Sequence, residues 1–181
     1  MRVYQWYLDG VHPPPHSALD HALPEHLHIT THATRFLRQQ LELPGKTRGG
    51  MLFGISNGDT LEVHLATRLG HPATERDRVL EPDRGYALGV SEALSALGKG
   101  NWDWCGNWLS YPHVHLEGIR TDLNWLIRGA RQGLVDEEHP LLVVGWLEGI
   151  LTVRAYVLEF GSPLTPSSLR WRSLKVSEVT S

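Results

Sequence analysis

Two tight-turn signals, each lying between two apolar segments, constrain the fold of this chain more than any other feature. Asn57-Gly58-Asp59 separates the apolar segments 50–56 and 60–68, and Glu148-Gly149 divides the apolar stretch from Pro140 to Phe160. Asn, Asp and Gly readily adopt the positive φ angles of a tight hairpin turn. The sequence therefore predicts two β-hairpins that are far apart along the chain.

Three helical segments and one further strand are predicted around these hairpins. Apolar residues repeat at helical spacing from about Leu27 to Pro44, with Thr30 or Thr31 as a possible N-cap. A second helix is predicted at 86–97, closed by Gly98, and a third begins with Thr121 as its cap. Segment 102–111 is predicted as a strand. The order of helix, hairpin, helix, strand, helix, hairpin is typical of an α/β or α+β fold, with a mixed sheet flanked by helices.

The two ends of the chain differ in composition from the middle. Residues 1–26 are predicted to hold a short strand, Val3–Leu8, and an arm rich in Pro and His. Residues 27–160 form the expected domain, and residues 161–181 a C-terminal tail or edge strand. Six of the eleven His residues lie in the first 32 positions, where they are expected to be solvated.

Composition excludes several classes of protein. With 181 residues and 41% hydrophobic residues, the chain is long and apolar enough to bury a core. The net charge of -3 does not favour nucleic-acid binding, and the apolar runs are too short to span a membrane. Met1–Tyr7 is too polar for a signal peptide, and the single cysteine, Cys105, excludes an internal disulfide framework. We therefore expect a soluble, cytoplasmic protein.

The most informative motif is the segment Gly106–Pro112 followed by Asp122. It reads Gly-Asn-Trp-Leu-Ser-Tyr-Pro, and ten residues separate Tyr111 from Asp122. This pattern resembles the signature of the JAMM/MPN (JAB) metalloprotease family, in which a strand carries Gly-x-Trp-His-x-His-Pro and a helix start carries an Asp at the same spacing. Other segments resemble further family strands and loops in the same order: Arg48–Gly54, Gly70–Asp83 and Leu141–Leu158. The resemblance covers about Leu27 to Phe160 and implies a JAMM/MPN-like fold.

Most catalytic residues of that family are absent from this chain. In active members two His and the Asp bind zinc, a Glu is the general base and a Ser assists the tetrahedral intermediate. Carried over one by one, the His positions hold Leu109 and Tyr111, the Glu position Thr47 and the Ser position Ile119, and only Asp122 is retained. A catalytic zinc ion needs about three protein ligands and an open position for water. The resemblance therefore implies a degenerate site with no cofactor and no hydrolysis by the family route.

A displaced zinc site remains the alternative. His113 and His115 follow directly after the motif and could join Asp122 if their loop folded back, because zinc ligands must converge to about 2 Å from one point. Otherwise both histidines face solvent. Asp122, beside Thr121, then has a simpler interpretation, as a carboxylate stabilised by the dipole of a helix N-terminus.

The predicted strand 102–111 also carries a possible binding platform. Trp102, Trp104 and Trp108 are even numbers of residues apart, so an unbroken strand would present them on one face. They could stack on a peptide or sugar, but packing beneath a helix is the interpretation that we favour. Cys105, in the same strand, is expected to be a buried, unreactive thiol.

Taken together, these patterns predict a catalytically inactive JAMM/MPN-like protein that acts as a protein-binding or scaffold module. The family resemblance implies as partner a second copy, an active JAMM paralogue or a ubiquitin-like protein. Two alternatives stay open, namely a zinc-dependent isopeptidase with displaced ligands and a ligand-binding module that uses the Trp-rich strand.

Overall fold

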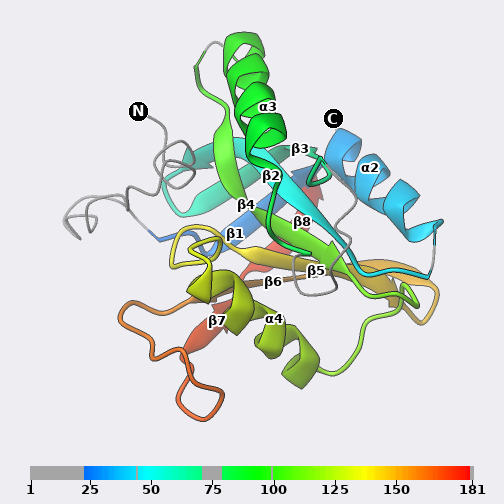
Figure 1. The fold of residues 1–181 in the computed structure, drawn as a ribbon, viewed down its shortest axis with the longest axis vertical. Helices are drawn as coiled ribbons and strands as arrows, with labels where there is room; N and C mark the ends of the chain where they lie inside the picture. The colour runs from blue at the N-terminus through cyan, green and yellow to red at the C-terminus, as the bar shows by residue number, and fades with distance from the viewer. Residues whose placement is uncertain (1–22, 44, 71–78, 99, 180–181) are drawn as a thin grey trace.

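The computed structural model describes residues 23–43, 45–70, 79–98 and 100–179, which form one mixed sheet and three helices (Figure 1). The helices are α2 (Thr31–Leu41), α3 (Arg84–Leu97) and α4 (Ile119–Arg131). The strands are β1 (His26–Thr30), β2 (Arg48–Asn57), β3 (Thr60–Ala66), β4 (Asp103–Ser110), β5 (Leu141–Leu147), β6 (Ile150–Leu158), β7 (Trp171–Ser173) and β8 (Lys175–Val179). Their order in the sheet is β7-β6-β5-β4-β2-β3-β1-β8.

The last two strands bring the two ends of this sheet together. β7 pairs with β6, whereas β8 pairs with β1, and Leu174 is the single residue between them. The Leu174 N–H donates to the Ala155 carbonyl at 3.0 Å, and the Lys175 N–H donates to the Glu25 carbonyl at 3.0 Å. One short segment therefore passes from one end of the strand order to the other, and the sheet is nearly closed.

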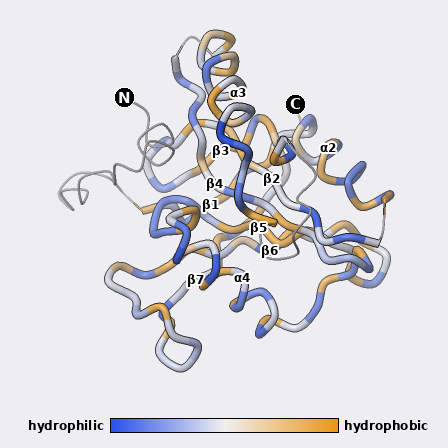
Figure 2. The backbone as a smooth tube through the Cα atoms, in the orientation of Figure 1, coloured by the Kyte–Doolittle hydropathy of each residue, from blue (hydrophilic) through white to orange (hydrophobic). Residues whose placement is uncertain are grey.

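Alternation along the strands divides the core between the two faces of the sheet. Leu142 and Val144 of β5 pack in a cluster with α2, whereas Leu141 and Val143 pack in a cluster with α4. α3 covers a third cluster, formed with β2 and β4 on the same face as α4. Figure 2 shows hydrophobic segments concentrated along β5 in the middle of the molecule, consistent with a strand that is covered on both faces.

Both predicted hairpins are confirmed, as is the mixed α/β class. Asn57 pairs with Thr60 and Leu147 pairs with Ile150, so each turn contains two residues. Gly58, Glu148 and Gly149 have φ angles of 63°, 53° and 80°, which are the positive values that such turns require.

The predicted starts of two helices are wrong. Residues 26–30 form β1 because Leu27 and Ile29 alternate with half-buried neighbours, and α2 begins after Thr30, whose side chain accepts from the Ala33 N–H. α4 begins at Ile119 after Gly118, so Thr121 is not its cap. The predicted strand Val3–Leu8 and residues 71–78 of the predicted loop lie outside the described residues. None of the described helices has the length and apolar character needed to cross a membrane.

A β-bulge separates the three indoles that were predicted to share one face. The pairing of β2 with β4 shifts between Leu52↔Gly106 and Phe53↔Trp104, which leaves Cys105 as an extra residue. Trp108 consequently packs in the cluster with α2, whereas Trp104 and Trp102 pack in the cluster with α3. The prediction of a single Trp-rich face is wrong, because period-two alternation does not survive a bulge.

Candidate functional site

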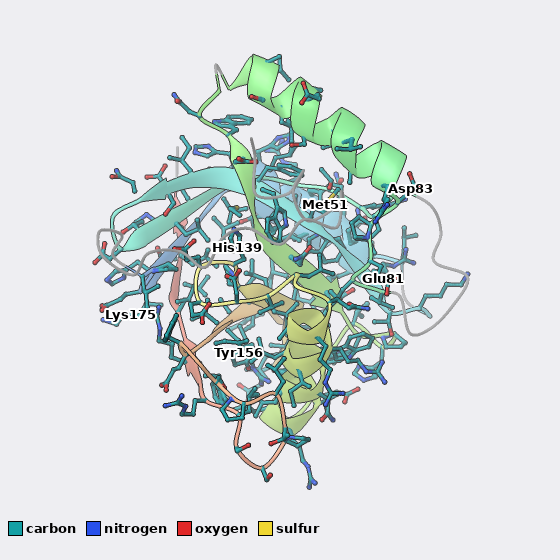
Figure 3. All side chains as sticks on the ribbon, turned by 60° about the vertical axis from the view of Figure 1, so that its left-hand side comes forward. Met51, Glu81, Asp83, His139, Tyr156 and Lys175 are labelled. Carbon is teal, nitrogen blue, oxygen red and sulfur yellow. The ribbon has the colours of Figure 1, made fainter. Side chains whose placement is uncertain are left out.

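The carboxylate of Asp122 is the centre of a buried polar network between α4 and the sheet. Its Oδ1 accepts from the Tyr111 hydroxyl at 2.5 Å, and its Oδ2 accepts from the Tyr156 hydroxyl at 2.7 Å and from Arg154 Nη1 at 3.1 Å. Asp122 is fully buried, and the side chain of Arg154 is 25% exposed. Figure 3 shows Tyr156 beside α4, on the sheet face that this helix covers. Both carboxylate oxygens are therefore hydrogen-bonded to protein groups.

Three segments bring these residues together. Tyr111 follows the last residue of β4, Asp122 lies in the first turn of α4, and Arg154 and Tyr156 are two apart on β6 and so face the same side. Arg154 Nη1 also donates to the Glu117 carbonyl at 2.7 Å, which ties β6 to the segment before α4. The network thus fixes the start of the helix against two strands.

The positions that the resemblance aligns with the family's catalytic residues differ from one another in burial and surroundings. Leu109 is fully buried in the apolar cluster that also contains Tyr111. Thr47 is half-buried and precedes Arg48, which pairs with Ser110 at the end of β4. Ile119 is 49% exposed at the start of α4. The side chains that hydrogen-bond to Asp122 are two phenols and a guanidinium, where a zinc site would need imidazole, thiolate or further carboxylate ligands.

These residues do not fit a zinc ion. Binding at Asp122 would require the ion to displace the hydrogen bonds of Tyr111, Tyr156 or Arg154, and neither a phenol protonated at neutral pH nor a guanidinium cation replaces an imidazole ligand. Burial, followed by the hydrogen bond to Asp122, raises the pKa of Tyr111 above its ordinary value. The same two causes raise the pKa of Tyr156. Both phenols are consequently hydrogen-bond donors. Their bonds to Asp122 have a structural role, because they hold α4 against the sheet.

Among the described residues, the side-chain contacts of His113 and His115 are within their own loop and with Tyr111, not with Asp122. Nε2 of His113 lies 2.8 Å from Glu117 Oε1, and Nδ1 of His115 lies 2.5 Å from the His113 carbonyl. Both hydrogen bonds are exposed. The alternative set of His113, His115 and Asp122 is therefore not assembled in this conformation of the loop.

One other group of metal-ligating side chains lies close together in the described parts of the chain. Ligand atoms of Glu25, His26 and Asp59 lie within 4.8 Å of one another, at the start of β1 beside the β2–β3 turn. Glu25 and Asp59 are exposed, and Lys175 pairs with His26 in the neighbouring strand. We assign no ion to this group, because exposed carboxylates commonly gather without one.

The indoles of Trp102, Trp104 and Trp108 do not form a shared aromatic cleft. Trp108 is fully buried and its Nε1–H donates to the Thr67 carbonyl at 2.8 Å. Trp104 is 4% exposed and is stacked on the ring of His139 at 4.2 Å, whereas the half-buried Trp102 is stacked on His64 at 5.1 Å. Trp104 and Trp108 thus belong to the core, as the favoured interpretation expected.

Burial holds Cys105 unreactive. The thiol is buried between β2 and β5 on the face of the sheet covered by α2, and this burial raises its pKa well above the ordinary value. Thiolate is the reactive form, so the expectation of an inert cysteine agrees with its surroundings.

Sequence reasoning missed a second acid–base pair, the partly exposed Asp136 and the buried His139, in the connection from α4 to β5. His139 is labelled in Figure 3. His139 Nδ1 lies 2.8 Å from Asp136 Oδ1, which also accepts the N–H groups of Glu138 and His139. Burial alone would lower the pKa of His139, but the Asp136 carboxylate raises it above 6.5. The spacing Asp-x-x-His in a short connection is the one signal that could have pointed to this pair.

Comparison with known proteins gives information on the fold but not on the function. No protein-family model and no curated protein matches the sequence. Among solved structures, the chain is similar to protein DSY2949 from Desulfitobacterium hafniense, whose structure was determined in solution. The TM-score is 0.55 and the identity 14%, over 84% of this chain and 94% of that one. At this identity the likeness concerns the fold alone, a mixed α/β sheet with helices.

Proposed function

We propose that this chain is a JAMM/MPN-like protein without hydrolytic activity, which acts as a protein-binding or scaffold module. The observation that carries the proposal is the buried Asp122 carboxylate, whose two oxygens accept hydrogen bonds from Tyr111, Tyr156 and Arg154. An active zinc site keeps a position open for water. Here a phenol and a leucine stand at the two positions that the resemblance aligns with imidazole ligands.

The chemistry of the network supports a structural role for these residues. Without a metal ion, water keeps its bulk pKa of about 15.7, and a nucleophile at neutral pH is not available by the family route. Asp122 is fully buried and both of its oxygens are hydrogen-bonded, so it is poorly placed to act as a general base toward a substrate. What the network does well is to hold α4 against β4 and β6.

The binding half of the proposal rests on the family resemblance and on surface residues. Inactive members of such families commonly associate through the same fold as active ones, an analogy at the level of fold. Leu147 and Ile150, at the tip of the β5–β6 hairpin, are 44% and 69% exposed. A second copy, an active JAMM paralogue and a ubiquitin-like protein are the partners to be tested.

Hydrolysis assays with and without added zinc test the proposal. We expect the native chain to leave peptide- and isopeptide-linked fusions of ubiquitin-like proteins intact at any zinc concentration. The matched variant combines Thr47→Glu, Leu109→His and Tyr111→His, and in a folded protein it should gain zinc binding. Chelator-sensitive cleavage by the native chain would contradict the proposal and would favour the displaced zinc peptidase.

Binding is measured separately. Sedimentation of the native chain over a range of concentrations tests self-association, and titration with a ubiquitin-like protein or an active JAMM protein tests the other two partners. A chain that remains monomeric and binds neither class would contradict the scaffold role, even if hydrolysis is absent.

A further inference from the structure

The turn between β2 and β3 places an exposed asparagine directly before an exposed glycine. Asn57 is the last residue of β2, and its pairing with Thr60 is the last pair of the hairpin. Gly58 has a φ angle of 63°, and the space that a Cβ would take there is open. Both residues are exposed to solvent. The side-chain amide of Asn57 and the peptide bond that follows it are therefore accessible at the tip of the hairpin.

A side-chain amide in this position can react with its own main chain. The backbone nitrogen of Gly58 attacks Cγ of Asn57 and closes a succinimide ring. The new N–Cγ bond forms as the Cγ–Nδ2 bond breaks, and Nδ2 leaves as ammonia after taking the proton of the attacking nitrogen. Water then opens the ring at either carbonyl carbon, which gives aspartate or isoaspartate. Water is the one co-reactant, and no oxidant or cofactor takes part.

The residue after the asparagine decides how readily this ring closes. Asn57 has to leave its extended conformation, and the next residue has to follow it. Glycine follows at the smallest steric cost because it has no Cβ. Asn57 also lies at the end of the strand pairing, and terminal segments of a fold open at a low free energy. Opening of the last pair is therefore sufficient, and the rest of the sheet stays folded.

The other three asparagines of the chain are each followed by tryptophan and have different surroundings. Asn107 is fully buried, and its Nδ2 donates to the Leu134 carbonyl at 2.7 Å. Asn124 is exposed but lies inside α4, where the next N–H belongs to the hydrogen bonds of the helix. Asn101 is exposed, but the bulky side chain of Trp102 follows it. The chain thus combines one favourable sequence with three internal comparisons.

We propose that Asn57 is a site of spontaneous deamidation, which yields isoaspartate together with aspartate. Either product carries a new negative charge beside the exposed Asp59. Isoaspartate also leads the main chain through the former side chain, which adds a methylene group to the turn. The Asp59 carbonyl accepts from the N–H groups of Glu25 and His26 at 2.7 and 3.0 Å. A longer turn displaces this acceptor and loosens the start of β1.

Peptide mapping by mass spectrometry, after incubation of the native chain at mildly alkaline pH, tests the proposal. The peptide that contains Asn57 should gain the mass of water minus that of ammonia. We expect its rate of conversion to exceed that of each other asparagine by about tenfold or more, because only Gly58 permits easy ring closure. The matched variant Asn57→Gln keeps a side-chain amide but needs a larger ring, which closes more slowly, so its peptide should stay unmodified.

Two results would overturn the proposal. One is conversion at equal rates at all four asparagines of the chain. The other is an unmodified Asn57 in the native chain under conditions that fully convert a synthetic peptide of residues 54–62, since the folded turn would then prevent ring closure.

Amide exchange tests the consequence for β1. The isoaspartate form is separated from the native chain by ion exchange, and Asn57→Asp is the matched variant with the same charge and no added methylene. In the isoaspartate form we expect the Glu25 and His26 amides to exchange about fivefold faster or more, while the amides of β5 stay unchanged. Unchanged exchange at Glu25 and His26 in that form would contradict the effect assigned to the longer turn.

Discussion

Two carboxylates at opposite ends of α4 are both paired with cationic partners, but with partners of different kinds. Asp122, in the first turn, is fully buried and is held by Arg154 and two phenols. Asp136, beyond the last turn, has a side chain that is 40% exposed and is paired with His139. Arginine stays charged at every pH at which the protein is folded, whereas histidine does not. The contact that holds the start of α4 is therefore independent of pH over this range, whereas the pair in the connection after α4 depends on pH.

Removal of the Asp122 carboxylate should have the largest effect. Asp122→Ala leaves Arg154 and two buried hydroxyls without their acceptor, and breaking such a pair costs about 3–5 kcal/mol. Urea unfolding monitored by tryptophan fluorescence measures the loss. Glu148→Ala, at an exposed turn, is the control and should change stability by less than about 0.5 kcal/mol. If Asp122→Ala also lowers the free energy of unfolding by less than about 0.5 kcal/mol, the network does not hold α4 against the sheet.

Deletion of one phenol should have an intermediate effect. Tyr111→Phe and Tyr156→Phe each remove a hydrogen bond to a charged acceptor, which contributes about 1.5–3 kcal/mol. Because the pKa of each phenol is raised in the folded protein, this stability is complete below the ordinary value of 10.0 and is lost as pH rises through the folded pKa. Unfolding between pH 7 and 11 should show a smaller alkaline loss in either variant than in the native chain. If the stability of both variants falls with pH by the same amount as that of the native chain, the hydrogen bonds assigned to the two phenols are contradicted.

The Asp136–His139 pair should give a smaller effect confined to a window of pH. The pKa of His139 is raised above 6.5, so its contribution is complete below 6.5 and is lost as pH rises through the folded value. Burial alone would raise the pKa of Asp136, but His139 and two backbone amides lower it below the ordinary value of 3.8. The contribution of Asp136 to stability is therefore complete above 3.8 and is lost as pH falls through the folded pKa. Since Asp136 is partly exposed, we expect about 1 kcal/mol or less between these limits. The difference in stability between the native chain and His139→Gln, followed from pH 4 to 9, measures it; a difference that grows above pH 7 would contradict the pairing.

The smallest effect is expected at the histidines beside the network. His113 bonds to Glu117 at the surface, and exposed pairs contribute about 0–1 kcal/mol. His113→Ala and His115→Ala together should therefore leave stability nearly unchanged, in contrast to Asp122→Ala. The midpoint of thermal unfolding, recorded with and without added zinc, provides the comparison. If zinc raises the midpoint of the native chain strongly and this increase is lost in the double variant, His113 and His115 bind zinc and the displaced metal site is supported.

Local turn chemistry made much of the fold predictable. The two hairpins followed from positive-φ residues at Gly58 and Gly149, and the end of α3 followed from Gly98. β1 was missed because residues 26–30 alternate over one short strand directly before a helix, and the sequence gives no sign that a later strand, β8, will pair with it. Pairing between distant segments is a tertiary property that short-range patterns do not carry.

The candidate site was predictable only in part. The family resemblance linked Tyr111 to Asp122 as aligned positions of one site, and these side chains do meet. Arg154 and Tyr156 come from β6, more than thirty residues further on, and nothing local connects them to Asp122. Trp104 and Trp108 were assigned to one face because the bulge at Cys105 has no sequence signal comparable to that of a turn.

The most direct test of the account is the zinc content of the native chain. Protein equilibrated with excess zinc and then desalted is analysed for bound metal, beside Asp122→Asn as the matched variant. If the hydrogen bonds of Tyr111, Tyr156 and Arg154 occupy the carboxylate, native and variant proteins retain the same low amount of zinc. One tightly held ion per native chain, lost in Asp122→Asn, would contradict the central claim.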